Sequence, residues 1–272
     1  MKRAITLGMG ALALAGLTLP AAAADLGARP YTKAPAMAPA PVFTWTGCYI
    51  GGFIGGAVAE RDVINTDIGG LPGTANFGVP WSDGLNHSWD TKLDSSFLGG
   101  GTLGCNYQWP GSSFVVGIEG EAGFLSLKGT AADPVSLGQS VFATTRIGDW
   151  YGMVTGRLGW AINTVLIYAK GGAAFVDVEH TVVDTCALAP CGPGLVTTGF
   201  SDTKTTWTAG GGIEWAFAPN WSVKAEYMFI SLDEIDRSCG VITGGAFTGS
   251  TTCFDHDVGG IHTGKLGLNF RF

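Results

Sequence analysis

Glu119 and Glu121 lie two positions apart in an alternating stretch of the chain, which puts both carboxylates on one face of a strand. Paired carboxylates can act as a general acid and a general base, as they do in glycosidases. Other acidic and basic residues lie on the same face of other alternating stretches. Together they give four acidic and four basic side chains that point inward. An enclosed charge needs a partner, because burying an unpaired one costs a large desolvation energy. We therefore predict a mutually neutralising network of Glu119, Glu121, Arg157, Lys170, Glu214, Lys224, Glu226 and Lys265.

Two other roles for this network stay open, namely a polar path for small solutes and a gate in which ion pairs exchange partners. Catalysis is disfavoured, because the paired carboxylates face inward and no cleft is implied. An enzyme site at the rim of a barrel would need a Ser/His or Asp/His set. His180, His256 and His262 are scattered along the sequence, and no motif accompanies them. We predict that the protein is not an enzyme and has no cofactor.

The stretches that carry these charges alternate between apolar and polar residues. In 221–229 the odd positions are apolar or aromatic, and the even positions are Ser222, Lys224, Glu226 and Met228. The same period of two occurs in 114–124, 150–162, 207–217 and 265–272, and less cleanly near 45–59, 97–109 and 165–176. Such alternation is typical of a strand with one face toward lipid and the other toward a polar lumen.

Short and long connections alternate between these strands. Tight-turn signals occur at 109–112, 163–164 and 219–220, and long polar stretches lie near 60–95, 127–145, 178–204 and 231–260. Four hairpins with this order predict an all-β fold, a transmembrane antiparallel up-and-down β-barrel of about eight strands, OmpA-like, with short periplasmic turns and long extracellular loops.

A soluble β-sandwich also alternates, but it would not repeat short and long connections in strict order. It would also not place tryptophans beside the short turns, where an aromatic girdle at the membrane interface requires them. The residues in question are Trp45, Trp109, Trp160, Trp215 and Trp221.

The N-terminal region and the composition agree with an exported membrane protein. Lys2 and Arg3 precede a short apolar run that ends at Ala22-Ala23-Ala24, so we predict a signal peptide at 1–24 rather than an anchor. Residues 25–43 are rich in Pro and Ala and predict a periplasmic tether, followed by the barrel at 44–272. Charged residues make up only 14% of the chain, and the net charge of −7 disfavours nucleic acid as a partner.

Three segments resemble the small outer-membrane proteins of alphaproteobacteria, the RopB-type or porin-family barrels. They are Trp45-Thr46-Gly47-Cys48-Tyr49-Ile50-Gly51-Gly52, Gly99-Gly100-Gly101-Thr102-Leu103-Gly104-Cys105-Asn106-Tyr107-Gln108 and the closing stretch 265–272. The resemblance implies an eight-stranded barrel that is an abundant envelope component and surface antigen; some relatives are proposed to bind haem or to act as porins. Phe270 and the terminal Phe272 look like the signal through which the barrel-assembly machinery recognises its clients.

Six cysteines in an exported chain favour disulfides. Cys48 and Cys105 fall at similar depth on the first two strands, and the other four cysteines share two long loops. We predict the pairs Cys48–Cys105, Cys186–Cys191 and Cys239–Cys253, with metal binding by Cys186 and Cys191 as the rival for the second pair.

Two loop motifs could bind ligands. Asp255-His256-Asp257 could hold a divalent cation or meet the cations of lipopolysaccharide, although a solvated loop explains it too. The loop aromatics Trp81, Trp89, Phe247 and Phe254 could contact a host surface or haem, or pack the loops together. We predict an outer-membrane protein with a structural and surface-antigen role, in contact with lipid and lipopolysaccharide. The alternatives are a narrow porin and a loop-mediated binding module.

Overall fold

The computed structural model describes residues 43–69, 87–134, 141–185, 195–232, 234–245 and 248–272. These residues form thirteen strands, and none of them lies in a helix long and apolar enough to cross a membrane. The predicted signal peptide, Cys186, Cys191, Trp81 and Phe247 lie outside the described residues.

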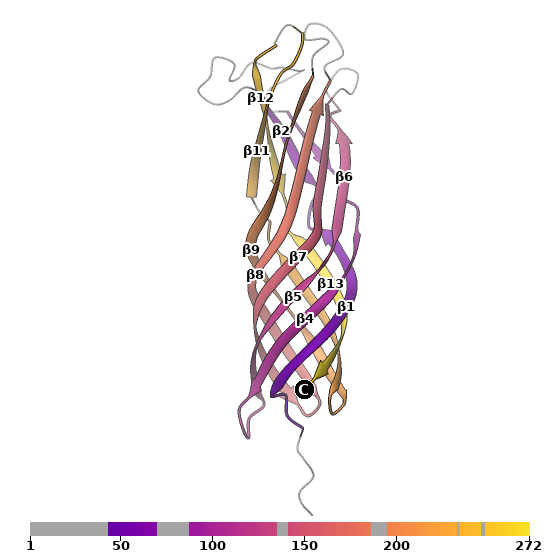
Figure 1. The fold of residues 1–272 in the computed structure, drawn as a ribbon, viewed down its shortest axis with the longest axis vertical. Helices are drawn as coiled ribbons and strands as arrows, with labels where there is room; N and C mark the ends of the chain where they lie inside the picture. The colour runs from indigo at the N-terminus through magenta and orange to yellow at the C-terminus, as the bar shows by residue number, and fades with distance from the viewer. Residues whose placement is uncertain (1–42, 70–86, 135–140, 186–194, 233, 246–247) are drawn as a thin grey trace, which may run out of the picture. The chain divides into compact units, whose positions relative to one another are not determined.

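Eight of the strands close into an antiparallel barrel (Figure 1). They are β1 (Gly47–Ala59), β4 (Ser96–Gln108), β5 (Phe114–Phe124), β7 (Val141–Ile162), β8 (Val165–Asp184), β9 (Val196–Ala218), β10 (Trp221–Ile230) and β13 (Ile261–Arg271). Each pairs with its neighbours in chain order, and β1 meets β13 from Tyr49↔Arg271 to Ala59↔Ile261. The barrel therefore leaves no free edge, as a membrane-spanning sheet requires.

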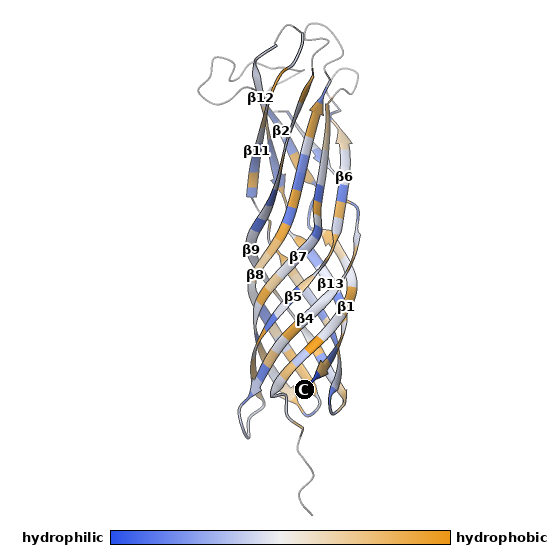
Figure 2. Cartoon of the chain, viewed as in Figure 1, coloured by the Kyte–Doolittle hydropathy of each residue, from blue (hydrophilic) through white to orange (hydrophobic). Residues whose placement is uncertain are grey.

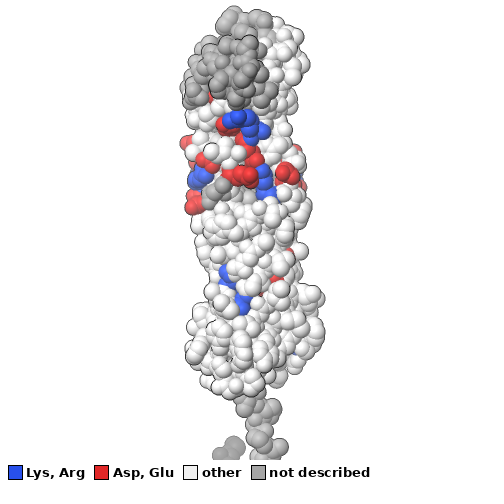
Figure 3. Space-filling view, turned by 90° about the vertical axis from the view of Figure 1, so that its left-hand side faces the viewer, with Lys and Arg blue, Asp and Glu red and all other residues white. Residues whose placement is uncertain are grey.

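The alternation in the sequence becomes an apolar outer face and a polar lumen. Ile118 and Leu266 are 60% and 65% exposed on the outside, whereas their neighbours Glu119 and Lys265 are 1% and 3% exposed inside. In Figure 2 orange bands alternate with white and blue bands along the barrel strands. In Figure 3 the charged side chains on the viewed face gather mainly above the barrel, and the wall below is almost uncharged.

One tryptophan departs from the expected girdle. Trp109, Trp160, Trp215 and Trp221 are between 42% and 57% exposed near the short turns, but Trp45 is only 2% exposed. Its ring packs edge-on against Phe43, and its Nε1 donates to the carbonyl of Asn163 at 3.3 Å. Trp45 precedes the first strand and folds under the barrel, so it closes the turn end of the lumen instead of facing lipid.

The long connections differ from the polar loops that the sequence predicted, because their described parts contain further strands. These are β2 (Val63–Gly69), β3 (His87–Thr91), β6 (Ser126–Ala132), β11 (Glu234–Val241) and β12 (Thr251–Val258). Together with the far ends of β7, β8 and β9 they form what we call the extension, beyond the barrel end opposite the short turns (Figure 1).

The extension has two sheets. One has the order β11-β12-β2-β3, and the other is made by β6 and the far ends of β7–β9, which continue the barrel sheet. β7, β8 and β9 each run as one strand from barrel to extension, whereas residues 60–62, 92–95, 125, 231–232 and 259–260 lie between the other strands and interrupt them. A cluster of buried apolar residues from both sheets, including Trp89, Val182 and Phe254, packs between them.

Candidate functional site

The eight charged residues predicted to face inward all lie in the barrel lumen and are all at most 6% exposed. They come from six strands: Glu119 and Glu121 from β5, Arg157 from β7, Lys170 from β8, Glu214 from β9, Lys224 and Glu226 from β10, and Lys265 from β13. The period of two along each strand turns every one of these side chains toward the axis. The structure thus brings the whole predicted set together.

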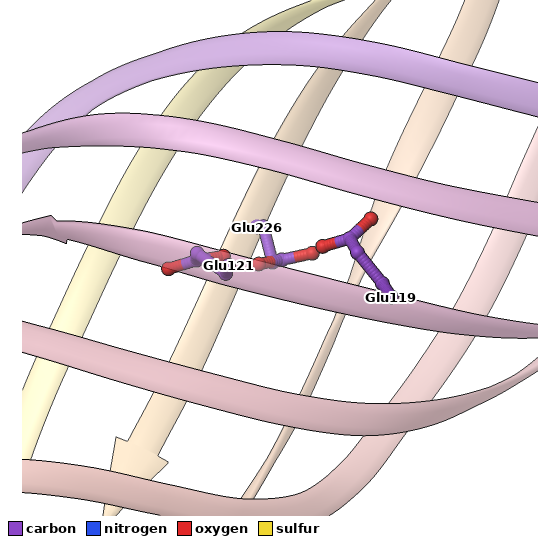
Figure 4. Close-up of side chains that lie close together, drawn as sticks. All are labelled: Glu119, Glu121 and Glu226. Carbon is purple, nitrogen blue, oxygen red and sulfur yellow. The ribbon is translucent and has the colours of Figure 1, made fainter.

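Three glutamates and three lysines form the larger part of the cluster. Lys170 Nζ lies 2.6 Å from Glu119 Oε1 and 3.0 Å from Glu226 Oε2. Lys265 Nζ lies 2.7 Å from Glu121 Oε1 and 2.9 Å from Glu226 Oε1, and Lys224 Nζ donates to Glu119 Oε1 at 3.1 Å. Figure 4 shows the three carboxylates reaching toward one another. Each lysine bridges carboxylates and neutralises their mutual repulsion.

Arg157 and Glu214 form a second unit in the same lumen. Their side chains are ion-paired, and the guanidinium carbon lies 3.5 Å from the centre of the Tyr168 ring. Ser222 and Asn269 donate to Glu214 Oε1 at 2.5 and 2.9 Å. The carboxylate therefore has the extra hydrogen bonds that a buried ion pair needs to offset its desolvation.

Three tyrosines complete the cluster, and the sequence analysis missed them. Tyr49 donates to Glu119, Tyr151 donates to Glu121 at 2.8 Å, and Tyr168 donates to Glu226 at 2.9 Å. Tyr168 lies two residues before Lys170, and this spacing could have indicated its inward direction. Tyr49 could not be assigned, because the first strand is apolar on both faces.

The carboxylates of Glu119, Glu121 and Glu226 have oxygens within 4.8 Å of one another, a spacing that could suit a cation. The three lysine ammonium groups already contact these oxygens, so a divalent ion would have to displace them. In this arrangement the lysines neutralise the three carboxylates, and the tyrosines donate hydrogen bonds to them.

Apolar clusters lie on both sides of these charges. Trp45, Val115 and Leu166 belong to the cluster at the turn end. Phe53 and Met228 belong to a larger cluster toward the extension. The charged layer is therefore enclosed along the barrel axis as well as by the barrel wall.

A family model described as an outer membrane protein beta-barrel domain matches residues 9–272. The chain belongs to this outer-membrane β-barrel family. It is 30% identical over 245 residues to the 31 kDa outer-membrane immunogenic protein of Brucella melitensis, covering 88% of this chain and 89% of the relative. It is 26% identical over 196 residues to the 22 kDa outer membrane protein of Rhizobium leguminosarum, covering 72% and 68%.

Two solved structures have weak similarity to this chain. Ail, the attachment invasion locus protein of Yersinia pestis, has 14% identity and a TM-score of 0.33, covering 84% of this chain and 99% of Ail. AlkL in lipid bilayers has 12% identity and a TM-score of 0.36, covering 86% and 95%.

Membership of the outer-membrane family fixes the orientation of the barrel. Outer-membrane barrels have short periplasmic turns and longer connections outside. The short turns at 109–113, 163–164 and 219–220 therefore face the periplasm. The extension lies on the extracellular side of the membrane.

Two disulfides occur among the described residues of this outer-membrane barrel. Cys48 lies directly opposite Cys105 in the pairing of β1 with β4, and the two are bonded across a separation of 57 residues. Cys239 and Cys253 are bonded between β11 and β12 in the extension. The third predicted pair, Cys186–Cys191, stays a prediction.

Replacing Cys105 by serine should lower the free energy of unfolding of the barrel by about 2–4 kcal/mol, because the unfolded chain loses a long cross-linked loop. Denaturant unfolding in lipid, followed by tryptophan fluorescence, measures the change. Cys253→Ser is the matched control and should leave the barrel transition in place, since its bond lies in the extension. Alkylation of Cys48 or Cys105 in the native protein without reductant would contradict the bond.

The motif Asp255-His256-Asp257 lies on β12 and not in a solvated loop. Asp255 is paired with Arg237 at 2.6 Å, and Asp257 is paired with Arg61 at 2.6 Å. His256 points to the opposite face and is fully buried. The three side chains therefore do not converge on one cation.

The described loop aromatics are packed inside the extension. Trp89 and Phe254 are 4% and 1% exposed, and their rings meet edge-on with centroids 6.2 Å apart. The sequence left two explanations for these aromatics. Packing of the loops together accounts for both Trp89 and Phe254. Binding of a host surface or haem stays a prediction, without support from these two residues.

Proposed function

We propose that this outer-membrane protein is a closed structural barrel that stabilises the envelope and does not conduct solutes. The observation that supports this proposal is the balanced cluster of four acids and four bases, buried in the lumen between apolar layers. A barrel of eight strands is only wide enough for its own side chains. Ion pairs that fill this space also hold opposite walls together.

Single-channel recording in a planar bilayer tests the proposal. Protein shown to be folded by its resistance to protease should give no discrete conductance steps, because ions would have to displace the buried pairs. A wide porin recorded in the same bilayer serves as the positive control. Reproducible steps from the folded protein would overturn the closed barrel in favour of the narrow porin.

We propose further that the extension is the part of the protein exposed on the cell surface and that it acts as an antigen. Two observations support this role: the strands of the extension continue beyond the barrel, and one relative is named an outer-membrane immunogenic protein. Lipid surrounds the barrel wall, and we propose that lipopolysaccharide contacts the charged band above it (Figure 3).

The same geometry supports the absence of enzymatic activity. Glu119 and Glu121, the paired carboxylates of the sequence, each contact a lysine and a tyrosine, so neither is placed to act on a substrate. We propose that assembly depends on Phe270 and Phe272 as the signal read by the barrel-assembly machinery. Phe272 is 68% exposed at the end of the closing strand, where a partner can reach it.

A further inference from the structure

Two histidines that are far apart in the sequence meet inside the extension. His180 belongs to β8 and His256 to β12, so the pair joins the two sheets. Their ring centroids lie 3.5 Å apart, and both residues are 0% exposed. A membrane-spanning strand needs about 9–11 residues. His180 is the sixteenth residue of β8 counted from the periplasmic turn, and β12 lies wholly in the extension.

The hydrogen bonds of the pair suit uncharged rings. The Nδ1 of His256 lies 3.0 Å from Asn65 Oδ1, which can only accept, and its Nε2 lies 2.8 Å from the hydroxyl of Ser238. His180 Nδ1 lies 2.7 Å from the Thr145 hydroxyl, but its Nε2 is buried with no hydrogen-bond partner among the described residues. A proton added at this nitrogen would therefore be buried without an acceptor.

The surroundings offer little to offset such a charge. Phe200 packs beside both rings, with centroid distances of 6.0 Å to His180 and 6.1 Å to His256. Asp236 is the β11 partner of His256 in register, but it is ion-paired with Lys204 of β9. The charged or titratable residues that share the inward parity on the packed strands are Asp67, His87, Asp133, Asp184, Asp202, Lys204, Glu234 and Asp236, of which Asp202 and Glu234 are exposed. His87 and Asp133 pair with each other at 2.8 Å.

In the part of the chain that the structure describes, few backbone hydrogen bonds join the two sheets at their edges. Among the described residues, an isolated bridge between Leu195 and Thr243 joins the chain just before β9 to the chain just after β11. On the other side, between β3 and β6, the amide of Asp94 donates to the carbonyl of Lys128 at 2.9 Å. Side-chain packing, with the histidine pair at its centre, therefore carries much of the contact between the sheets.

We propose that His180 and His256 form a pH-sensitive clamp, whose protonation separates the two sheets of the extension while the barrel stays folded. At neutral pH both rings are uncharged and pack together. In acid, both rings would become positively charged while their centroids are only 3.5 Å apart in the closed extension, so they would repel each other. The surface that the protein presents to the outside would then change with pH.

The direction of the pH dependence follows from burial. Burial lowers the pKa of His180 to about 4, and burial together with the neighbouring His180 lowers the pKa of His256 to about 2. An exposed histidine has a pKa of about 6.5, so the open extension binds protons first. The stabilisation is complete above about pH 6.5 and is lost as the pH falls toward about 4.

Amide hydrogen exchange on the protein in lipid nanodiscs tests the clamp. Between pH 7.5 and pH 5.0, corrected for intrinsic exchange rates, amides of β12 and of the far end of β8 should lose at least about tenfold in protection. Amides of β10 in the barrel should not change. At pH 5.0 most carboxylates are still ionised, so the histidines account for the difference.

Matched variants test whether the His180–His256 pair causes the loss of protection at pH 5.0. The double variant His180→Gln/His256→Gln should keep its protection at pH 5.0, whereas His262→Gln, outside the pair, should respond like the wild type. Equal loss in the double variant, or no loss in the wild type, would overturn the proposal. If the double variant does not fold, ring chemical shifts of the wild-type histidines decide. Protonation of both rings near pH 6.5 with the extension still protected would also overturn it.

Discussion

Replacing Arg157 by methionine should lower the free energy of unfolding by about 3–5 kcal/mol, the typical cost of breaking a buried ion pair from one side. Arg157 is the ion-pair partner of Glu214, and both are almost fully buried. Without the guanidinium, Glu214 keeps its hydrogen bonds from Ser222 and Asn269 but loses its counter-charge. Denaturant unfolding in lipid vesicles measures the loss.

Two further variants separate the buried charge from the loss of a side chain. Arg157→Met combined with Glu214→Gln should recover about half of the loss or more, because no charge is then left unpaired. Arg237→Met removes the same type of side chain from an exposed pair with Asp255 and should cost at most about 1 kcal/mol. Equal costs at Arg157 and Arg237 would contradict a tightly enclosed lumen.

Valine at Gly55 should prevent most of the protein from closing its barrel. A Cβ at Gly55 would lie 2.0 Å from the carbonyl oxygen of Gly264, on the strand that pairs with β1. This contact cannot be relieved by a side-chain rotation, because the backbone alone determines the positions of the Cβ and of the carbonyl oxygen. We expect a cost of more than about 3 kcal/mol and a clear loss of folded protein in the outer membrane.

The neighbouring Gly56 provides the control. A Cβ there would lie 3.8 Å from the nearest atom, the carbonyl oxygen of Ser96, at ordinary contact distance on the outer face. Gly56→Val should therefore fold like the wild type, and valine is favoured in strands. The folded fraction is read from the heat-dependent shift of the band in gel electrophoresis. Equal folded fractions for the two variants would show that the seam between β1 and β13 can widen.

The charges of the lumen could be predicted because a strand has a period of two. Glu119 lies next to Ile118 and Lys265 lies next to Leu266, and these apolar neighbours must face lipid, which leaves only the lumen for the charge. Trp45 could not be placed in this way, because it lies before the first strand and no pairing fixes its direction.

The extension could not be predicted from the same pattern. Outside the membrane both faces of a strand can be polar, so the alternation of apolar and polar residues fades. On β2 the buried positions include Asn65 and Asp67, which look like loop residues in the sequence. The meeting of His180 with His256 depends on the packing of two sheets, which spacing along the chain does not reveal.

The interrupted strands of the extension make the molecule mechanically asymmetric. β8 and β9 keep one unbroken register from Val165↔Trp215 near the periplasmic turn to Asp184↔Val196 at the outer end, and the pairing of β7 with β8 has a single bulge, between Ile147 and Tyr151. The sheet β11-β12-β2-β3 joins the barrel through four short connections, which include the described residues 60–62, 92–95, 231–232 and 259–260. A load applied to that sheet passes to the barrel through these four short segments, whereas the same load on the opposite wall passes along strands that continue into the membrane-embedded barrel. At the outer end, the wall formed by β7, β8 and β9 should therefore move less relative to the barrel than the sheet β11-β12-β2-β3.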